Sequence, residues 1–279
     1  MQRWFYTVQP NAPALLAERA ARQAILETPL PEVAAEQVSR ALADWTELLD
    51  GFIEAGLCEK TGVAVMQAEW CYEGRSVPQS RVIMLGMQHD YARLSQAPEV
   101  EAGAEVIRPY GRAAHAAKQV AGWLRQESWA AEPVTGPMTG DFTLIPPALA
   151  CGFGDLGKHG SIIDRDLGAN FRLSAVLTDA PFAPTSTREH GIDAFCASCR
   201  ICEDACPPEA IYPEKQQVRG AQVVRGFRLV PIVLQRASRL WDLHRGLFVV
   251  STRNGTKLGD QVGTMRSRTK GNGTCPMMS

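Results

Sequence analysis

The stretch CASCRICEDACPPEAI, residues 196–211, spaces four cysteines as CxxCxxCxxxC and has a proline directly after the last one. The four are Cys196, Cys199, Cys202 and Cys206. This spacing is typical of a [4Fe–4S] segment in which the first three cysteines hold one cluster and the fourth ligates a second cluster. Another cysteine run must complete both clusters, yet only Cys275 follows Cys206. The sequence therefore predicts the first half of a ferredoxin-like iron–sulfur segment.

Length and composition indicate a globular protein with a sizeable core, since 45% of the 279 residues are hydrophobic. The N-terminus, MQRWFYTVQPNAP, has neither an apolar run behind a basic segment nor a twin arginine, and no stretch approaches 18 consecutive apolar residues. We therefore expect a cytoplasmic protein without a membrane span. In that setting, cysteines at cluster spacing favour metal binding over disulfides.

Charge is distributed unevenly along the chain. Residues 221–279 hold ten Lys and Arg against two acidic residues, a net charge of +8, and the whole chain carries −1, which leaves −9 for the preceding residues. A basic tail ordinarily indicates a nucleic-acid or partner contact. Here the abrupt change of composition favours another cause, given below. The acidic upstream part favours a neutral small molecule over a nucleic acid as partner.

Hydrophobic patterning predicts an α/β or α+β core from Gly62 to Thr185. A helix that Gly56 ends is predicted by apolar residues at three- and four-residue steps, namely Val38, Leu42, Trp45, Leu49 and Phe52. We predict strands in the β-rich runs at 62–70, 81–87, 142–150 and 171–184, and a helix at 113–126.

A glycine-rich loop, GFGDLGKHGSIIDRDLGANFR, spans residues 152–172 and has five glycines between Gly152 and Gly168. Glycines allow positive φ angles and let the main chain approach a flat or anionic ligand closely. Lys158 and His159 lie in the middle of this loop. The plainer alternative is a mobile surface loop with a solvated lysine. The order GxxxxGK[ST] is absent, so this is not a phosphate loop.

Four ordered segments together resemble the cobalamin-dependent reductive dehalogenases of the cytoplasmic, non-respiratory type. They are HDY at 89–91, LIPPALACGFGDLGKHGSII at 144–163, LSAVLTDAPFAP at 173–184 and HGIDAFCASCRICEDACPPEAI at 190–211. The resemblance runs from about Gly62 to Gly220. Epoxyqueuosine reductases, which modify tRNA, share the GKH element and the ferredoxin run and are the nearest alternative. A ferredoxin-like electron carrier is a third, although about 190 residues precede the first cluster cysteine.

The resemblance implies an α+β fold with a nitroreductase-like, cobalamin-binding core and a ferredoxin-like iron–sulfur segment. It implies a helical region at 1–61, a catalytic core at 62–185, half of a 4Fe-4S domain at 186–220 and an atypical basic tail at 221–279. The cofactors would be cobalamin and two 4Fe-4S clusters. The substrate would be a small organohalide, in our prediction a halogenated aromatic. The electron donor would be an external ferredoxin, flavodoxin or reductase domain.

The resemblance also implies site residues. A tyrosine in such enzymes delivers the proton that replaces the halogen, and a nearby cation stabilises the phenolate and the departing halide. An unperturbed phenol has a pKa near 10, and an adjacent ammonium favours its ionised form. Our candidates are Tyr91 as donor, with Tyr110 as the second possibility, and Lys158 as the cation. The candidate cobalamin-binding residues are Gly152, Gly154, Gly157, His159, Gly160 and Ser161.

Several residues have plainer interpretations. A tyrosine that follows a β-run is most often a half-buried core residue, which is the alternative for Tyr91. Three further cysteines are too far apart in sequence for a local metal site and are predicted to be small core residues, namely Cys58, Cys71 and Cys151. His190 is predicted to be structural.

We further predict that the residues after about Gly220 are a frameshifted reading of the missing half-ferredoxin. A leucine codon ending in TG, followed by a codon that begins with T or C, spells cysteine when read one base later. Three pairs permit this, with the spacing CxxCxxxC: Leu240–Trp241, Leu243–His244 and Leu247–Phe248. The first cluster then lacks a ligand, and because cluster binding contributes folding free energy, we expect the chain to be inactive or poorly folded.

Overall fold

The computed structural model describes residues 12–36, 38, 40–97, 99–136, 140–187, 190–205, 211–214, 216–217 and 223–224. Cys206 and nearly all of the predicted frameshifted tail lie outside these residues. The described chain divides into two compact units. Residues 12–153 and 171–187 form the core unit, and residues 154–170 with those from 190 onward form the cluster unit.

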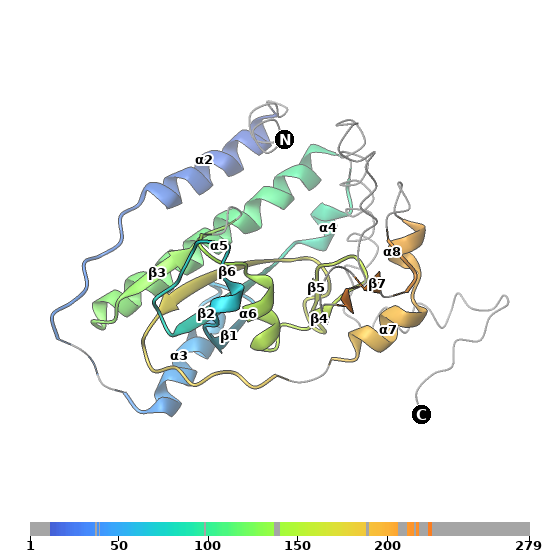
Figure 1. Cartoon of the computed structure of the whole chain (residues 1–279). Coiled ribbons are helices and arrows are strands. Elements are labelled where there is room, and N and C mark those ends of the chain that lie inside the picture. Colours follow the sequence, from blue (N-terminus) through green and yellow to red (C-terminus); the bar gives the residue numbers. More distant parts are fainter. Residues whose placement is uncertain are drawn as a thin grey trace. The chain divides into compact units, whose positions relative to one another are not determined.

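The core unit is built on a four-stranded antiparallel sheet with strand order β1-β2-β6-β3 (Figure 1). Its strands are β1 (Lys60–Val65), β2 (Arg81–Gln88), β3 (Ala131–Val134) and β6 (Phe171–Thr178). β2 and β6 pair over their full length, with Ile83 opposite Val176 and Met87 opposite Arg172. All residues of β2 except its two ends are buried, because helices cover both faces of the sheet.

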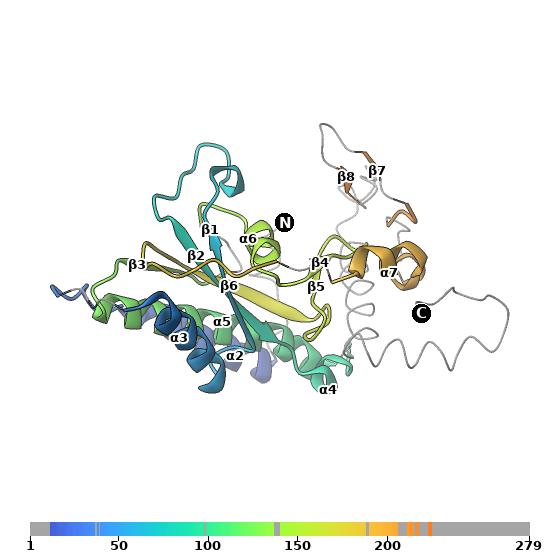
Figure 2. The same ribbon diagram turned by 90° about the horizontal axis from the view of Figure 1, so that it is seen from below.

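Three helices cover one face of this sheet, and a short one lies on the other (Figure 2). The first set is α2 (Pro13–Glu27), α3 (Leu42–Glu54) and α5 (Val100–Gln126), and the short helix is α6 (Ile145–Ala150). A 3-10 turn (Ala68–Trp70) follows β1, and α4 (Tyr91–Leu94) follows β2. Small buried residues such as Ala113, Ala116 and Ala117 line α5, so its backbone can lie close to the elements it packs against.

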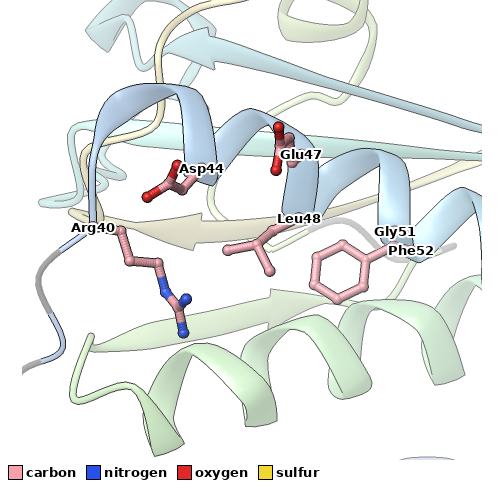
Figure 3. Close-up of a pocket in the computed structure, with 6 residues that line it drawn as sticks. All are labelled: Arg40, Asp44, Glu47, Leu48, Gly51 and Phe52. Atoms are coloured by element: carbon pink, nitrogen blue, oxygen red, sulfur yellow. The ribbon is translucent and has the colours of Figure 1, made fainter.

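Trp45 of α3 is fully buried in the core unit. Its ring meets the edges of Trp123, Trp129 and Phe182, with centroid distances of 6.0, 6.1 and 4.9 Å. The Arg40 guanidinium lies 5.9 Å from the centre of the Trp45 ring, which adds a cation–π contact. A cavity beside α3 is lined by Arg40, Asp44, Glu47, Leu48, Gly51 and Phe52 (Figure 3).

The cluster unit contains two short hairpins and two short helices. They are β4 (Asp155–Leu156) with β5 (Ile162–Ile163), β7 (Gln216–Gln217) with β8 (Val223–Val224), α7 (Ile192–Ser198) and α8 (Ile201–Asp204). The glycine-rich loop supplies the first hairpin, and the cysteine run supplies α7 and α8. Residues 154–170 of the glycine-rich loop and the cysteine run therefore belong to one unit.

Most predicted elements are confirmed, with differences in their bounds. The helix predicted from Val38 begins at Leu42, and the strand predicted at 171–184 ends at Thr178. The predicted run at 62–70 ends as a strand at Val65, and the helix predicted at 113–126 begins at Val100. The strand predicted at 142–150 is wrong, because Ile145–Ala150 forms α6. Pro146 and Pro147 occupy its first turn, where a missing N–H costs no helical hydrogen bond. Among the described residues, no helix is long and apolar enough to cross a membrane.

Candidate active site

The HDY segment ends β2 and begins α4. Asp90 caps this helix, since its Oδ1 accepts hydrogen bonds from the Ala92 and Arg93 amides at 2.9 and 3.3 Å. Tyr91 occupies the first helical position, and 40% of its surface is exposed. The segment thus has a local structural purpose through Asp90. It leaves Tyr91 partly exposed to solvent.

The second tyrosine candidate, Tyr110 on α5, is half-buried and has a cation against its ring. The Arg172 guanidinium of β6 lies 4.6 Å from the ring centre. The Arg172 Nε is buried and has no hydrogen-bond partner among the described residues. Tyr110 and Arg172 are thus a phenol and a cation in direct contact inside the core unit. Sequence reasoning missed Arg172, whose only signal is a charged residue inside an apolar strand.

His89 is a buried, neutral neighbour of this pair. Burial, together with the positive charge of Arg172, lowers the pKa of His89 to about 3. Its Nδ1 lies 3.2 Å from the main-chain oxygen of Glu105. A carbonyl oxygen only accepts, so the proton of the neutral ring is on Nδ1.

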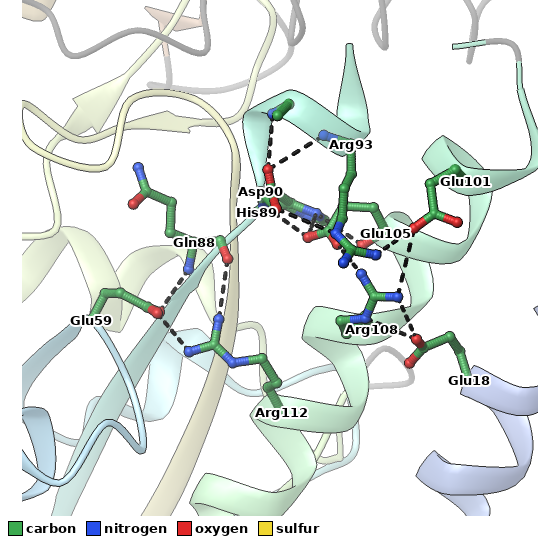
Figure 4. A network of polar contacts seen from close by, with 11 residues as sticks. Glu18, Glu59, Gln88, His89, Asp90, Arg93, Glu101, Glu105, Arg108 and Arg112 are labelled. Atoms are coloured by element: carbon green, nitrogen blue, oxygen red, sulfur yellow. Dashed lines mark hydrogen bonds and ion pairs between the residues drawn. The ribbon is translucent and has the colours of Figure 1, made fainter. Parts of the chain in front are cut away.

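Beside His89 lies a cavity of about 420 Å³ surrounded by ion pairs (Figure 4). Arg112 binds Glu59 at 2.5 Å, and Arg108 binds Glu18 of α2 and Glu105 at 2.7 Å each. Each of these arginines already has a carboxylate partner. We therefore interpret the network as a structural link between α2, α5 and the sheet.

Several glycines of the glycine-rich loop lie where another residue would clash with its neighbours or would have a strained φ angle. Gly154 has a φ of +111°, and a Cβ there would lie 2.0 Å from the Ile163 carbonyl oxygen. A Cβ on Gly157 would lie 2.6 Å from the Ile163 side chain. Gly152 and Gly160 also have positive φ angles, +82° and +77°. The backbone around the β4–β5 hairpin therefore favours glycine at 154, 157 and 160, and the end of α6 favours it at 152, whether or not a ligand approaches.

Lys158 is buried in this loop with only 2% of its side chain exposed. Its ammonium forms an ion pair with Glu203 of α8 and donates to the Cys199 carbonyl at 2.9 Å. The plainer interpretation of a solvated surface lysine is therefore wrong. Within the cluster unit, this lysine joins the glycine-rich loop to the cysteine run.

His159, the next residue, is also buried. Burial lowers its pKa to about 4, and its Nδ1 accepts a hydrogen bond from the Ser161 amide at 3.0 Å. The proton of the neutral ring is therefore on Nε2, which is buried and has no partner among the described residues. A buried, unpaired donor in this loop fits a ligand with hydrogen-bond acceptors, as cobalamin has.

The described cluster cysteines are free thiols in or between α7 and α8. Cys196 and Cys202 are buried and Cys199 is half-buried. Burial raises the pKa of the Cys202 thiol to about 12 and also raises that of Cys199. Within the described residues, no three His, Cys, Asp or Glu side chains are gathered closely enough to hold a metal ion. Three reduced thiols in this sequence spacing fit the donor chemistry of an iron–sulfur centre, and Cys206, the predicted ligand of the second cluster, is outside the described part.

The remaining candidates are divided between the two units. Tyr91, Tyr110 and Arg172 belong to the core unit, whereas Lys158 and His159 belong to the cluster unit. Cys58 and Cys151 are buried free thiols, as predicted, and Cys71 is half-buried. His190 is buried, and both of its ring nitrogens lack partners among the described residues.

A search of solved structures finds a catabolic reductive dehalogenase in complex with 3-bromo-4-hydroxybenzoic acid. The similarity has a TM-score of 0.66 and 18% sequence identity, and it covers 76% of this chain and 33% of that one. The chain is therefore similar in fold to about a third of a reductive dehalogenase. The predicted mixed α and β architecture is confirmed at this level.

Sequence comparison confirms the resemblance to reductive dehalogenases. The tetrachloroethene reductive dehalogenase of Desulfitobacterium hafniense is 33% identical over 167 residues, 60% of this chain and 30% of that protein. The epoxyqueuosine reductase of Alicycliphilus denitrificans is 38% identical over 60 residues, 22% of this chain and 16% of that protein. This chain therefore spans about a third of the dehalogenase relatives that it matches. No protein-family model matches it.

Proposed function

We propose that this chain is the core of an oxidoreductase that replaces the halogen of an organohalide with hydrogen. The reaction consumes two electrons and one proton, breaks the carbon–halogen bond, forms a carbon–hydrogen bond and releases halide. The observation that supports it best is the Tyr110–Arg172 pair in a core with the reductive dehalogenase fold. A phenol is the proton source, and a cation against its ring favours the phenolate left behind.

Cobalamin, when bound, supplies the chemistry that breaks the carbon–halogen bond, and 4Fe-4S clusters deliver electrons from an external donor. The glycine-rich loop is our candidate for holding cobalamin. Its buried, unpaired His159 Nε2 supports this assignment, since that N–H can donate to a bound group. Cys196, Cys199 and Cys202 are our candidates for the first cluster.

For the proton donor we favour Tyr110 over Tyr91. Tyr110 is half-buried against Arg172, whereas 40% of the Tyr91 surface is exposed and no cation–π partner is seen for it among the described residues. For the cation we favour Arg172, because the Lys158 ammonium is paired with Glu203. Tyr91 stays a candidate donor that the substitutions below test, and Lys158 stays a candidate for the cation.

Two measurements test the proposed function directly. Visible absorption is expected to show cobalamin bound by the purified chain. The predicted frameshift is expected to abolish turnover that depends on the clusters, so reduced methyl viologen, which bypasses them, is the electron source. With it, the loaded chain is expected to release bromide from 3-bromo-4-hydroxybenzoic acid. That substrate represents our halogenated aromatic, and tetrachloroethene is the comparison substrate. A chain that binds no cobalamin, or releases halide from neither compound, would refute the proposal.

Tyr110→Phe is expected to lower halide release at least about a hundredfold while cobalamin stays bound, because general acids contribute that much or more. Tyr72→Phe, on an exposed tyrosine, is the matched control. If Tyr91→Phe abolishes turnover and Tyr110→Phe does not, the assignment moves to Tyr91.

Reduction of epoxyqueuosine in tRNA is a second candidate function, supported by the local similarity to an epoxyqueuosine reductase. The negative charge upstream of the tail argues against tRNA phosphates as partners. Incubation with epoxyqueuosine-containing tRNA, followed by nucleoside analysis, separates the two functions.

A further inference from the structure

Helix α5 lacks one main-chain hydrogen bond beside Tyr110, and we call this position the Pro109 gap. Pro109 lies inside the helix and has no N–H, so the Glu105 carbonyl four residues earlier lacks its helical donor. The His89 Nδ1 lies 3.2 Å from this carbonyl oxygen. Because neutral His89 carries its proton on Nδ1, the ring supplies the hydrogen bond that proline removes.

The Glu105 side chain makes a second hydrogen bond to the residues that follow β2. Its carboxylate is buried, with 3% of the side chain exposed. Oε1 accepts from the Asp90 amide at 2.8 Å, and Oε2 accepts from Arg108 at 2.7 Å (Figure 4). The end of β2 is therefore tied to one turn of α5 by two hydrogen bonds, one to the Glu105 main chain and one to its side chain.

The turn of α5 that begins at Glu105 leads directly into Tyr110. An internal proline frees a helix to bend at that point, and an external contact then decides the direction of the following turn. Tyr110 directly follows Pro109, and its partner Arg172 is opposite Met87 in the β2–β6 register, two residues before His89. The same strand end thus borders both members of the phenol–cation pair.

We propose that the His89–Glu105 hydrogen bond at the Pro109 gap positions Tyr110 against Arg172, which makes His89 a positioning residue of the proton-donor site. The inference rests on the proposed role of Tyr110. A neutral His89 also leaves Arg172 as the cation against the phenol ring. The ring donates to α5 without adding a second positive charge beside the phenol.

The test compares two substitutions of His89 in the full chain. His89→Leu removes the donor, whereas His89→Asn keeps an N–H near the Nδ1 position. For His89→Leu we expect amide hydrogen exchange around Tyr110 in α5 to accelerate about tenfold, the effect of one lost hydrogen bond. His89→Asn is expected to restore most of the protection. His115→Leu, on an exposed histidine of the same helix, is the matched control.

Turnover provides the second readout. Halide release from 3-bromo-4-hydroxybenzoic acid by His89→Leu is expected to show a kcat about tenfold lower with KM unchanged, as misplacement of a catalytic group causes. His89→Asn is expected to recover kcat. Equal exchange in wild type and His89→Leu, no rescue by asparagine, or altered exchange with unchanged kcat would each overturn the proposal. If wild type releases no halide, the proposed function fails, and the exchange arm alone decides whether His89 fixes the Tyr110 turn.

Discussion

Lys158 lies in a loop, yet its side chain is almost completely buried. Its ammonium and the Glu203 carboxylate are both buried, with 2% and 8% of their side chains exposed. Loss of one partner of a buried ion pair leaves an uncompensated charge. The pair therefore holds the glycine-rich loop and the cysteine run together inside the cluster unit.

Glu203→Gln is accordingly expected to destabilise the cluster unit by about 3–5 kcal/mol. Asp204→Asn on the same helix is the matched control, since 67% of that side chain is exposed and its ion pair with Arg200 is worth at most about 1 kcal/mol. Hydrogen exchange of residues 154–170 and 192–204 measures both effects. Equal protection in the two variants would contradict the buried-pair interpretation.

His89 makes stability depend on pH. Its pKa is about 3 in the folded chain and about 6.5 when unfolded, so below pH 6.5 the unfolded chain takes up a proton that the folded chain refuses. Stability is then lost as the pH falls from 6.5 towards 3. At pH 4.5 this single residue is expected to cost about 2–3 kcal/mol. Denaturant unfolding of His89→Asn at pH 7 and 4.5 should show a smaller loss than wild type, and an equal loss would contradict it.

At the scale of elements, Gly154 is the glycine of the β4–β5 hairpin with the closest main-chain contact. Gly154 combines a φ of +111° with a Cβ position 2.0 Å from the Ile163 carbonyl oxygen, so an added methyl group forces the hairpin apart. Gly154→Ala is expected to destabilise the hairpin by at least about 2 kcal/mol. Gly51→Ala, where α3 has open space around the Cβ, is expected to stabilise by about 0.5–1 kcal/mol. Hydrogen exchange of the two segments compares them, and a tolerated Gly154→Ala would contradict the steric argument.

Elements with a repeating pattern or a clear stop signal could be predicted from sequence. The apolar steps of α3 and the uninterrupted apolar run of β2 are two examples. The composition of the run at 142–150 predicts a strand, whereas its paired prolines favour the first turn of a helix. The Tyr110–Arg172 contact could not be predicted, because it depends on the register between β6 and the sheet and on how α5 packs there. The HDY motif includes His89, but for the same reason its hydrogen bond to α5 could not be predicted from sequence.

At the scale of the whole molecule, the predicted frameshift has a direct test in the coding DNA. Read one base later, the codons for Leu240, Leu243 and Leu247 are expected to yield cysteines without stop codons. Stop codons or missing cysteines in that frame would refute the prediction. The tail itself lies outside the described residues, apart from the β8 strand.

Iron content gives the matching protein measurement. The anaerobically purified and reconstituted chain is expected to hold fewer than the roughly eight iron atoms of two 4Fe-4S clusters, because the second ligand run is missing. A chain that holds all eight would contradict the frameshift. A gene with the frame restored is the control, and it is expected to reach that content.

The alanine-lined surface of α5 has a consequence for mutational surveys of this protein. Ala113, Ala116 and Ala117 are completely buried in close-packed surroundings, so each larger side chain there overfills the core. A deep mutational scan scored by growth or abundance would therefore rank these alanines as intolerant as any residue that handles a proton. Intolerance along this helix reports packing. To identify catalytic residues along this helix, a scan needs conservative substitutions such as tyrosine to phenylalanine and arginine to lysine. These leave the volume of the core nearly unchanged.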